Sequence, residues 1–185
     1  MIASVLAGDS EQFQDLIRPY VRSVYRVARS LVQDESHAEK VVQEAVITAF
    51  RKLADFRRPT RFAAWLITIT LNAARGRLLG EGPGITKSVE HTCEAEQESS
   101  RAQLSSWSEI PAEALERKET QEILQSAIHD LCLACREVLL LRDMEGFSIE
   151  ETAAVLAIDA GTVKVRLHRA RLTILKKLAS QLGGG

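Results

Sequence analysis

The spacing of apolar residues predicts a chain built from helices. From about residue 10 to residue 79, apolar side chains recur every three or four residues in three segments, 10–32, 37–53 and 62–79. Pro19 should kink or split the first segment. Ser36 and Glu39 form the pattern of a capping box before the second, which should bury Ala38, Val42, Val46, Ala49 and Leu53. Strand-like alternation is scarce, so the predicted fold class is all-α.

A change in composition divides the chain into two predicted domains. From Gly80 to about Glu113 the sequence is rich in Gly, Pro, Ser, Glu and Gln and has no sustained period, as is typical of a linker. Helical spacing then resumes near Ala114. We therefore predict a helical domain at 1–79, a linker at 80–113 and a second helical domain at 114–182.

The stretch from Ser148 to Leu178 has the pattern of a helix-turn-helix. Ser148 and Glu151 match a capping box that starts a short helix. The run 157–161 predicts a tight turn in which Asp159 caps the next helix. In that helix Val163, Leu167, Ala170 and Ile174 share one inward stripe. An ordinary amphipathic helix pair with a solvated basic face is the alternative, but the agreement of cap, turn and charge favours DNA binding.

Residues on and beside the outward face of the second helix suit contact with a major groove. Side chains near the open face are placed to reach base edges, whereas cations on the flanks suit phosphates. We expect Thr162, Val165 and Arg169 to reach bases, Lys164, Arg166 and Arg171 to meet phosphates, and His168 to point outward with them.

The segment 62–79 is apolar around most of its circumference, yet carries one narrow polar stripe. Arg61, Thr68, Asn72 and Arg75 fall within one sector of the helical wheel, after the basic, proline-containing loop 56–62. A solvated edge explains the stripe as well as a nucleic-acid face does. In the second case Asn72 would pair with a base and the arginines with phosphates.

Composition and charge narrow the range of partners. With a formal net charge of -1 and a pI near 6.4, the chain does not resemble a protein that coats DNA without specificity. Positive charge is concentrated at residues 57–77 and 164–177. We recognise neither a signal peptide nor an apolar run of membrane-spanning length, so we expect a cytoplasmic protein without membrane insertion.

The three cysteines, Cys93, Cys132 and Cys135, fit a reducing compartment better than a disulfide framework. Together with His91 they offer a possible set of four zinc ligands, and a redox role is a further option. A single CxxC within a helical pattern is, however, more often a pair of small buried residues. We therefore predict no metal or other cofactor.

The order of segments resembles the extracytoplasmic-function (ECF) sigma factors, the short two-domain members of the sigma-70 family. Val24–Val46 (VYRVARSLVQDESHAEKVVQEAV) and Phe56–Leu79 (FRRPTRFAAWLITITLNAARGRLL) are similar to region 2 of that family. Arg136–Arg171 (REVLLLRDMEGFSIEETAAVLAIDAGTVKVRLHRAR) is similar to region 4. Ala157 stands where the family commonly has glycine, and Val165 where serine is common.

The resemblance implies a role for each set of residues. Glu39, Gln43 and Glu44 would lie on the helix that grips the polymerase clamp. Arg58, Arg61, Thr68, Asn72 and Arg75 would meet the -10 element, and Thr162, Lys164, Val165, Arg166, His168, Arg169 and Arg171 the -35 element.

The predicted function is therefore that of a promoter-recognition subunit, not an enzyme. Its partners would be core RNA polymerase, through the clamp and flap regions, promoter DNA, and an anti-sigma factor. A stand-alone helix-turn-helix regulator is the alternative.

Overall fold

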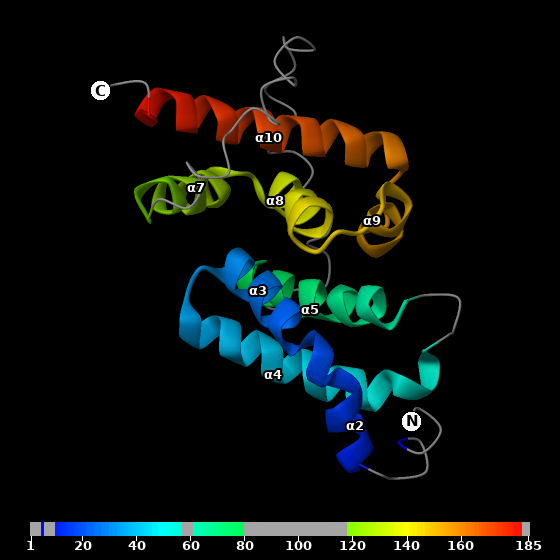
Figure 1. Ribbon diagram of the computed structural model, residues 1–185. Coiled ribbons are helices and arrows are strands. Elements are labelled where there is room, and N and C mark those ends of the chain that lie inside the picture. Colours follow the sequence, from blue (N-terminus) through cyan, green and yellow to red (C-terminus); the bar gives the residue numbers. More distant parts are fainter. Residues whose placement is uncertain (1–4, 6–9, 57–60, 80–117, 183–185) are drawn as a thin grey trace. The chain divides into compact units, whose positions relative to one another are not determined.

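The computed structural model describes residue 5 and residues 10–56, 61–79 and 118–182 (Figure 1). All regular structure in these ranges is helical, which confirms the predicted all-α class. The chain divides into two compact units, residues 1–83 and 84–185. The predicted linker, 80–113, lies outside the described residues.

The first unit is built on three helices that pack against one another. α2 (Ser10–Ile17) leads through a 3₁₀ turn, η1 (Arg18–Tyr20), into α3 (Val21–Val32). The break at Pro19 confirms the predicted interruption of the first segment. α4 (Glu35–Lys52) ends in a second 3₁₀ turn, η2 (Leu53–Asp55), and α5 (Phe62–Leu79) contacts both α3 and α4. The buried residues are mainly Val24, Val27, Ala28, Leu31, Ala38, Val41, Ala45, Ala49, Leu53, Ala64, Leu66, Ile67, Leu71 and Ala74.

One local prediction about α4 is wrong, and another is wrong in part. The helix is capped by Asp34, whose Oδ1 accepts a hydrogen bond from the His37 amide at 2.8 Å, and not by Ser36. Gln33 ends α3 in the left-handed conformation (φ 62°), which leaves Asp34 extended at the cap position.

The buried face of α4 matches the prediction at Ala38, Ala49 and the following Leu53 but differs at two other positions. It is formed by Ala38, Val41, Ala45 and Ala49, whereas Val42 and Val46 are half-buried. α4 packs against two helices, so three of its four buried positions are small alanines, while Val42 and Val46 lie at the edge of the buried face.

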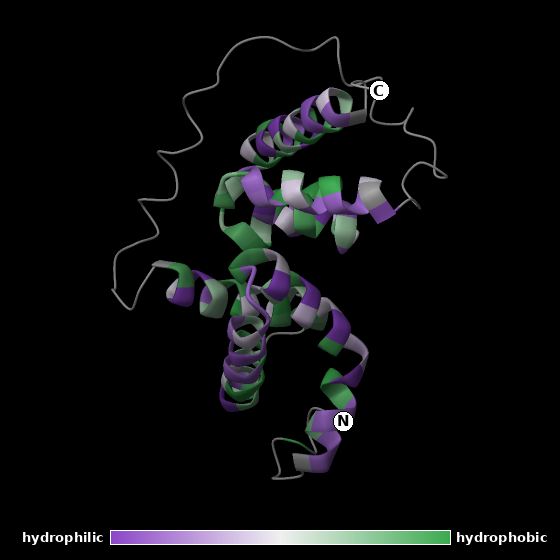
Figure 2. Ribbon diagram, turned by 90° about the vertical axis from the view of Figure 1, so that its left-hand side faces the viewer, coloured by the Kyte–Doolittle hydropathy of each residue, from purple (hydrophilic) through white to green (hydrophobic). Residues whose placement is uncertain are grey.

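The second unit is organised around the long helix α10 (Ala160–Leu182), which packs against α7 (Lys118–Asp130), α8 (Leu133–Leu139) and α9 (Ile149–Leu156) (Figure 1). Hydrophobic and hydrophilic positions are interspersed along the helices of the unit (Figure 2). The sequence pattern does not predict η6 (Leu140–Met144), a π-helical turn that continues α8. The core includes Ala127, Leu131, Ala134, Val138, Leu139, Leu140, Leu141, Phe147, Val155, Leu156, Val163, Leu167, Ala170, Ile174 and Leu178.

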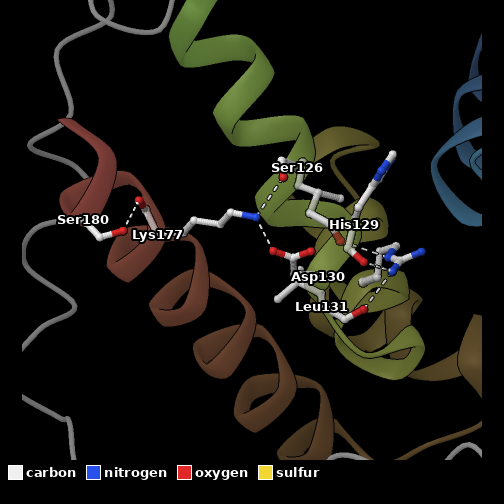
Figure 3. Close-up of polar contacts among 8 residues, drawn as sticks. Ser126, His129, Asp130, Leu131, Lys177 and Ser180 are labelled. Atoms are coloured by element: carbon white, nitrogen blue, oxygen red, sulfur yellow. Dashed lines mark hydrogen bonds and ion pairs between the residues drawn. The ribbon is translucent and has the colours of Figure 1, made fainter.

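Two cations fix the C-terminal end of α7. Arg136 is buried, and its guanidinium donates to the carbonyls of Ile128 at 3.0 Å and Leu131 at 2.9 Å and also to that of His129. Burial lowers the pKa of Arg136, and nearby acids oppose that shift. From α10, Lys177 Nζ donates to Ser126 at 2.8 Å and pairs with Asp130 (Figure 3). Arg136 satisfies carbonyls that the helix end leaves without partners, and Lys177 ties the side chains of α7 to α10.

Candidate nucleic-acid interface

The helix-turn-helix begins with the predicted capping box. Ser148 Oγ accepts a hydrogen bond from the Glu151 amide at 3.0 Å, and Glu151 Oε2 accepts one from the Ser148 amide at 2.8 Å. α9 ends at Ala157, which adopts the left-handed conformation with φ 55° and ψ 43°. An alanine therefore occupies a backbone state that favours glycine.

Asp159 caps α10, as predicted. Its carboxylate accepts hydrogen bonds from the Thr162 amide at 2.8 Å and the Thr162 hydroxyl at 2.5 Å. These bonds hold the pKa of Asp159 below its ordinary value. A Cβ at Gly161 would lie 2.9 Å from Asp159 Oδ1, so a side chain there would push the capping carboxylate out of its present position. The Thr162 hydroxyl donates within the cap, which leaves its oxygen to accept from a ligand.

The outward face of α10 is accessible within the second unit. Val163, Ala170 and Ile174 are buried on the predicted inward stripe, with Leu167 beside them. On the opposite side Lys164 is exposed, and Val165 is 50% exposed despite being apolar. The remaining members of the predicted set on this surface, Arg166, His168 and Arg169, are half-buried.

Arg171 differs from the other predicted phosphate contacts, because a carboxylate holds it. Its Nε donates to Asp143 Oδ2 at 2.9 Å and its Nη2 to Asp143 Oδ1 at 2.6 Å. The sequence predicted the helix on which Arg171 lies but not this partner from η6.

The predicted polar stripe of α5 is partly exposed. Arg61 and Asn72 are exposed, and Arg75 is half-buried. Thr68 donates its hydroxyl hydrogen to the Ala64 carbonyl at 2.8 Å, so only its oxygen is left to bind a partner. Arg58 lies outside the described residues.

Four aromatic rings gather where α5 begins, a feature that helical periodicity did not predict. Phe62 lies 5.4 Å from Tyr20, 5.5 Å from Phe56 and 5.5 Å from Trp65 between ring centroids, and Phe56 lies 5.3 Å from Trp65. All four are half-buried. The cluster joins η1, the residue that follows η2, and α5, and it fixes the first turn of the helix that carries the polar stripe.

The three polar residues predicted on α4, Glu39, Gln43 and Glu44, are all exposed. Arg77 of α5 pairs with Glu44, with Nη2 to Oε2 at 3.1 Å, beside a cavity of about 320 Å³ that Leu78 also lines. The sequence did not predict the pairing of Glu44 with Arg77, since the two residues are 33 positions apart.

The two described cysteines, Cys132 and Cys135, differ in their bonding. Cys132 is disulfide-bonded, which corrects the expectation that the cysteines do not form a disulfide, whereas Cys135 is a buried thiol. Burial raises the pKa of the Cys135 thiol, and the charges of Arg166 and Arg169 partly oppose this. Two of the four candidate zinc ligands, His91 and Cys93, lie outside the described residues.

Comparisons with known proteins decide the family. Residues 6–82 match the model of Sigma-70 region 2, and residues 121–174 match that of Sigma-70, region 4. The RNA polymerase sigma-H factor of Pseudomonas aeruginosa is 33% identical over 178 residues, which cover 96% of this chain and 92% of that protein. The ECF RNA polymerase sigma-E factor of Escherichia coli K12 is 32% identical over the same shares. The chain belongs to the ECF group of the sigma-70 family.

Solved structures agree with this assignment. The sigma factor RpoE of Bartonella quintana, solved with the anti-sigma factor NepR, is 25% identical with a TM-score of 0.68, over 91% of this chain and 97% of that one. CnrH, solved with the cytosolic domain of CnrY, has the same fold with a TM-score of 0.66 at 24% identity, over 97% and 95% of the two chains.

As an ECF sigma factor, the chain directs core RNA polymerase to promoters, and the stand-alone regulator is not favoured. Within the described ranges, no helix is both long and apolar enough to cross a membrane.

Proposed function

We propose that this sigma factor divides promoter reading between its two units, with α10 on the -35 element and the polar stripe of α5 on the -10 element. The observation that carries the proposal is the accessible outward face of α10, presented by a doubly capped helix-turn-helix within the segment that matches region 4. The predicted domain limits, 1–79 and 114–182, follow the same division.

The chemistry of the α10 face supports base reading near the start of the helix. Val165 is half exposed and apolar, so it suits a thymine methyl group and offers no hydrogen bond of its own. Lys164 and Arg166 flank it and suit phosphates. Each correct base pair would contribute roughly 1–3 kcal/mol, so reading by one short helix gives limited specificity and a second contact region is needed.

The α5 stripe supplies that second region in our proposal. Exposed Asn72 has both a donor and an acceptor for the edge of a base, and Arg61 and Arg75 supply positive charge. The aromatic cluster at the start of α5 holds that end of the helix in place against Phe56. This arrangement suits a base that has left the stack as the duplex opens.

Polymerase binding is assigned to the exposed face of α4. Glu39, Gln43 and Glu44 lie within two turns of this helix and give it carboxylates and an amide for a basic or polar partner surface. We also propose contact between the second unit and the polymerase flap, together with a cytoplasmic location, where polymerase and DNA are found.

An anti-sigma factor is the proposed regulator. RpoE, one of the similar solved proteins, is bound to an anti-sigma factor. Binding to both units would keep the α5 and α10 surfaces from engaging one promoter together. A partner that coelutes with the chain and blocks its transcription would support the proposal, and a partner that leaves transcription unchanged would contradict it.

In vitro transcription with core polymerase and a pool of promoter sequences tests the function and finds the recognised sequence. On the promoters selected, Arg169→Ala should reduce initiation about five-fold or more where the upstream element is required. Lys176→Ala, which removes an exposed cation from the same helix beyond the region 4 match, is the matched control and should retain activity.

Two results would contradict the proposal. The first is an Arg169→Ala variant as active as the control. The second is a wild-type chain that binds paired half-sites as a dimer and does not bind core polymerase, which is the behaviour of a stand-alone regulator.

A further inference from the structure

The cations of α10 do not share one environment. Lys164 and Arg171 lie seven residues apart, and therefore on the same flank of the helix. Lys164 is exposed, whereas the guanidinium of Arg171 forms two parallel hydrogen bonds with the Asp143 carboxylate, at 2.6 and 2.9 Å. Bidentate pairs of this kind are among the strongest charge-assisted contacts in proteins.

The pair is also partly shielded from water. The side chains of Arg171 and Asp143 are 25% and 20% exposed, unlike those of Arg77 and Glu44 in the first unit, at 36% and 49%. Solvent and salt weaken exposed ion pairs most, so the Arg171–Asp143 contact should persist at physiological salt. A DNA phosphate would have to displace Asp143 to gain this guanidinium.

The π-helical turn η6 determines where Asp143 lies. In that turn the Glu145 amide donates to the Leu140 carbonyl at 3.0 Å, five residues back, and the Phe147 amide donates to that of Leu141 at 2.9 Å. One extra residue in a turn rotates the next part of the chain by roughly 100° relative to a regular α-helix. Leu140 and Leu141 remain buried on one side, while Asp143 meets α10.

We propose that Asp143 is a positioning residue for the recognition helix, and that it withdraws Arg171 from the set of cations that contact phosphate. The proposal rests on the reading of the -35 element by α10. Asp143 fixes α10 at a point between its buried stripe and its DNA face, and it cancels one positive charge beside that face. Arg171 then supports the angle of the helix, while Lys164 and Arg166 neutralise phosphates.

The salt dependence of DNA binding distinguishes a cation that contacts a phosphate from one that is paired with a carboxylate of the protein. Each phosphate contact adds about 0.9 to the magnitude of the slope of log K against log salt concentration. The experiment uses holoenzyme assembled from the full chain and core polymerase, on a labelled duplex promoter chosen by the transcription pool. The slope is measured for wild type, Lys164→Gln, Arg171→Gln and Asp143→Asn, with circular dichroism melting as a control for folding.

The proposal predicts a different result for each variant. Lys164→Gln should reduce the slope by about 0.9, and Arg171→Gln should leave it unchanged. Asp143→Asn should increase it by about 0.9, because Arg171 becomes available to a phosphate. Asp143→Asn should also lose discrimination against a promoter with a changed upstream element, and Asp143→Glu should restore it.

An Arg171→Gln variant whose slope falls as much as that of Lys164→Gln overturns the proposal, and this result decides the question even if Asp143→Asn does not fold. An Asp143→Asn variant with wild-type slope and discrimination overturns it as well. A wild-type chain that fails to assemble with core polymerase refutes instead the proposed function on which the inference rests.

Discussion

Replacing Ala157 with glycine should stabilise the second unit, although it removes a side-chain atom. Ala157 ends α9 with φ 55° and ψ 43°, and its amide donates to the Ala153 carbonyl. The left-handed conformation costs an L-residue roughly 1–2 kcal/mol, since Cβ approaches the following carbonyl. Glycine adopts it without that penalty.

The expected gain is smaller than this penalty, because glycine has more freedom to lose on folding. That loss offsets roughly 0.5–1 kcal/mol. Ala157 is exposed, so removing its methyl group gives up little buried surface. The net stabilisation should be about 0.5–1 kcal/mol. For a unit of this size it corresponds to a rise in Tm of roughly 2–8 °C.

Hydrogen exchange of the α9 and α10 amides measures the effect in the second unit alone, with thermal melting followed by circular dichroism as a second readout. Ala154→Gly is the matched control, since Ala154 is also exposed but lies within α9. It should destabilise the unit by about 1 kcal/mol. If both variants destabilise the unit equally, the argument from the left-handed conformation is refuted.

Three further predictions concern other single contacts. Asp159→Ala should lower the Tm at neutral pH, because it removes the cap of α10. The lowered pKa of Asp159 means that the cap stabilises the fold above its ordinary pKa of 3.8 and is lost as pH falls through the lower folded value. Melting curves of variant and wild type should therefore converge as the pH is lowered past that value, and a constant difference would contradict the assignment. Arg136→Met should destabilise the second unit by about 3 kcal/mol in urea unfolding, because carbonyls at the end of α7 lose a buried charged donor, and an effect below about 1 kcal/mol would argue against that role. Asn72→Ala should slow promoter opening, measured by permanganate reactivity of unpaired thymines, and opening at the wild-type rate would exclude Asn72 from base capture.

Features set by neighbours a few residues apart were predicted best. The capping box of Ser148 and Glu151 and the cap of Asp159 on Thr162 each span three residues, so backbone geometry alone brings the partners together. The break at Pro19 has the same local origin. The inward stripe of α10 was also predicted correctly, since that helix has one dominant buried side.

The prediction of buried residues failed in part on α4, which packs against two helices at once. On α4 the wheel favoured Val42 and Val46, but packing against both α3 and α5 placed Val41 and Ala45 in the core. The helical wheel assigned α4 a single buried side, whereas packing against two helices decides which positions are buried, and Val41 and Ala45 lie there while Val42 and Val46 do not. The aromatic cluster around Phe62 likewise joins residues from three separate parts of the chain.

The order of residues along the chain was enough to predict the helices, the helix-turn-helix, the family and the candidate residues. Which charges are already engaged within the protein emerged only from the folded arrangement. Arg171 meets Asp143 across 28 positions, and Arg77 meets Glu44 across 33. A π-helical turn places Asp143 against Arg171, and the packing of α4 against α5 places Glu44 against Arg77. Neither contact can be read from the spacing of apolar residues, because that spacing describes one helix at a time.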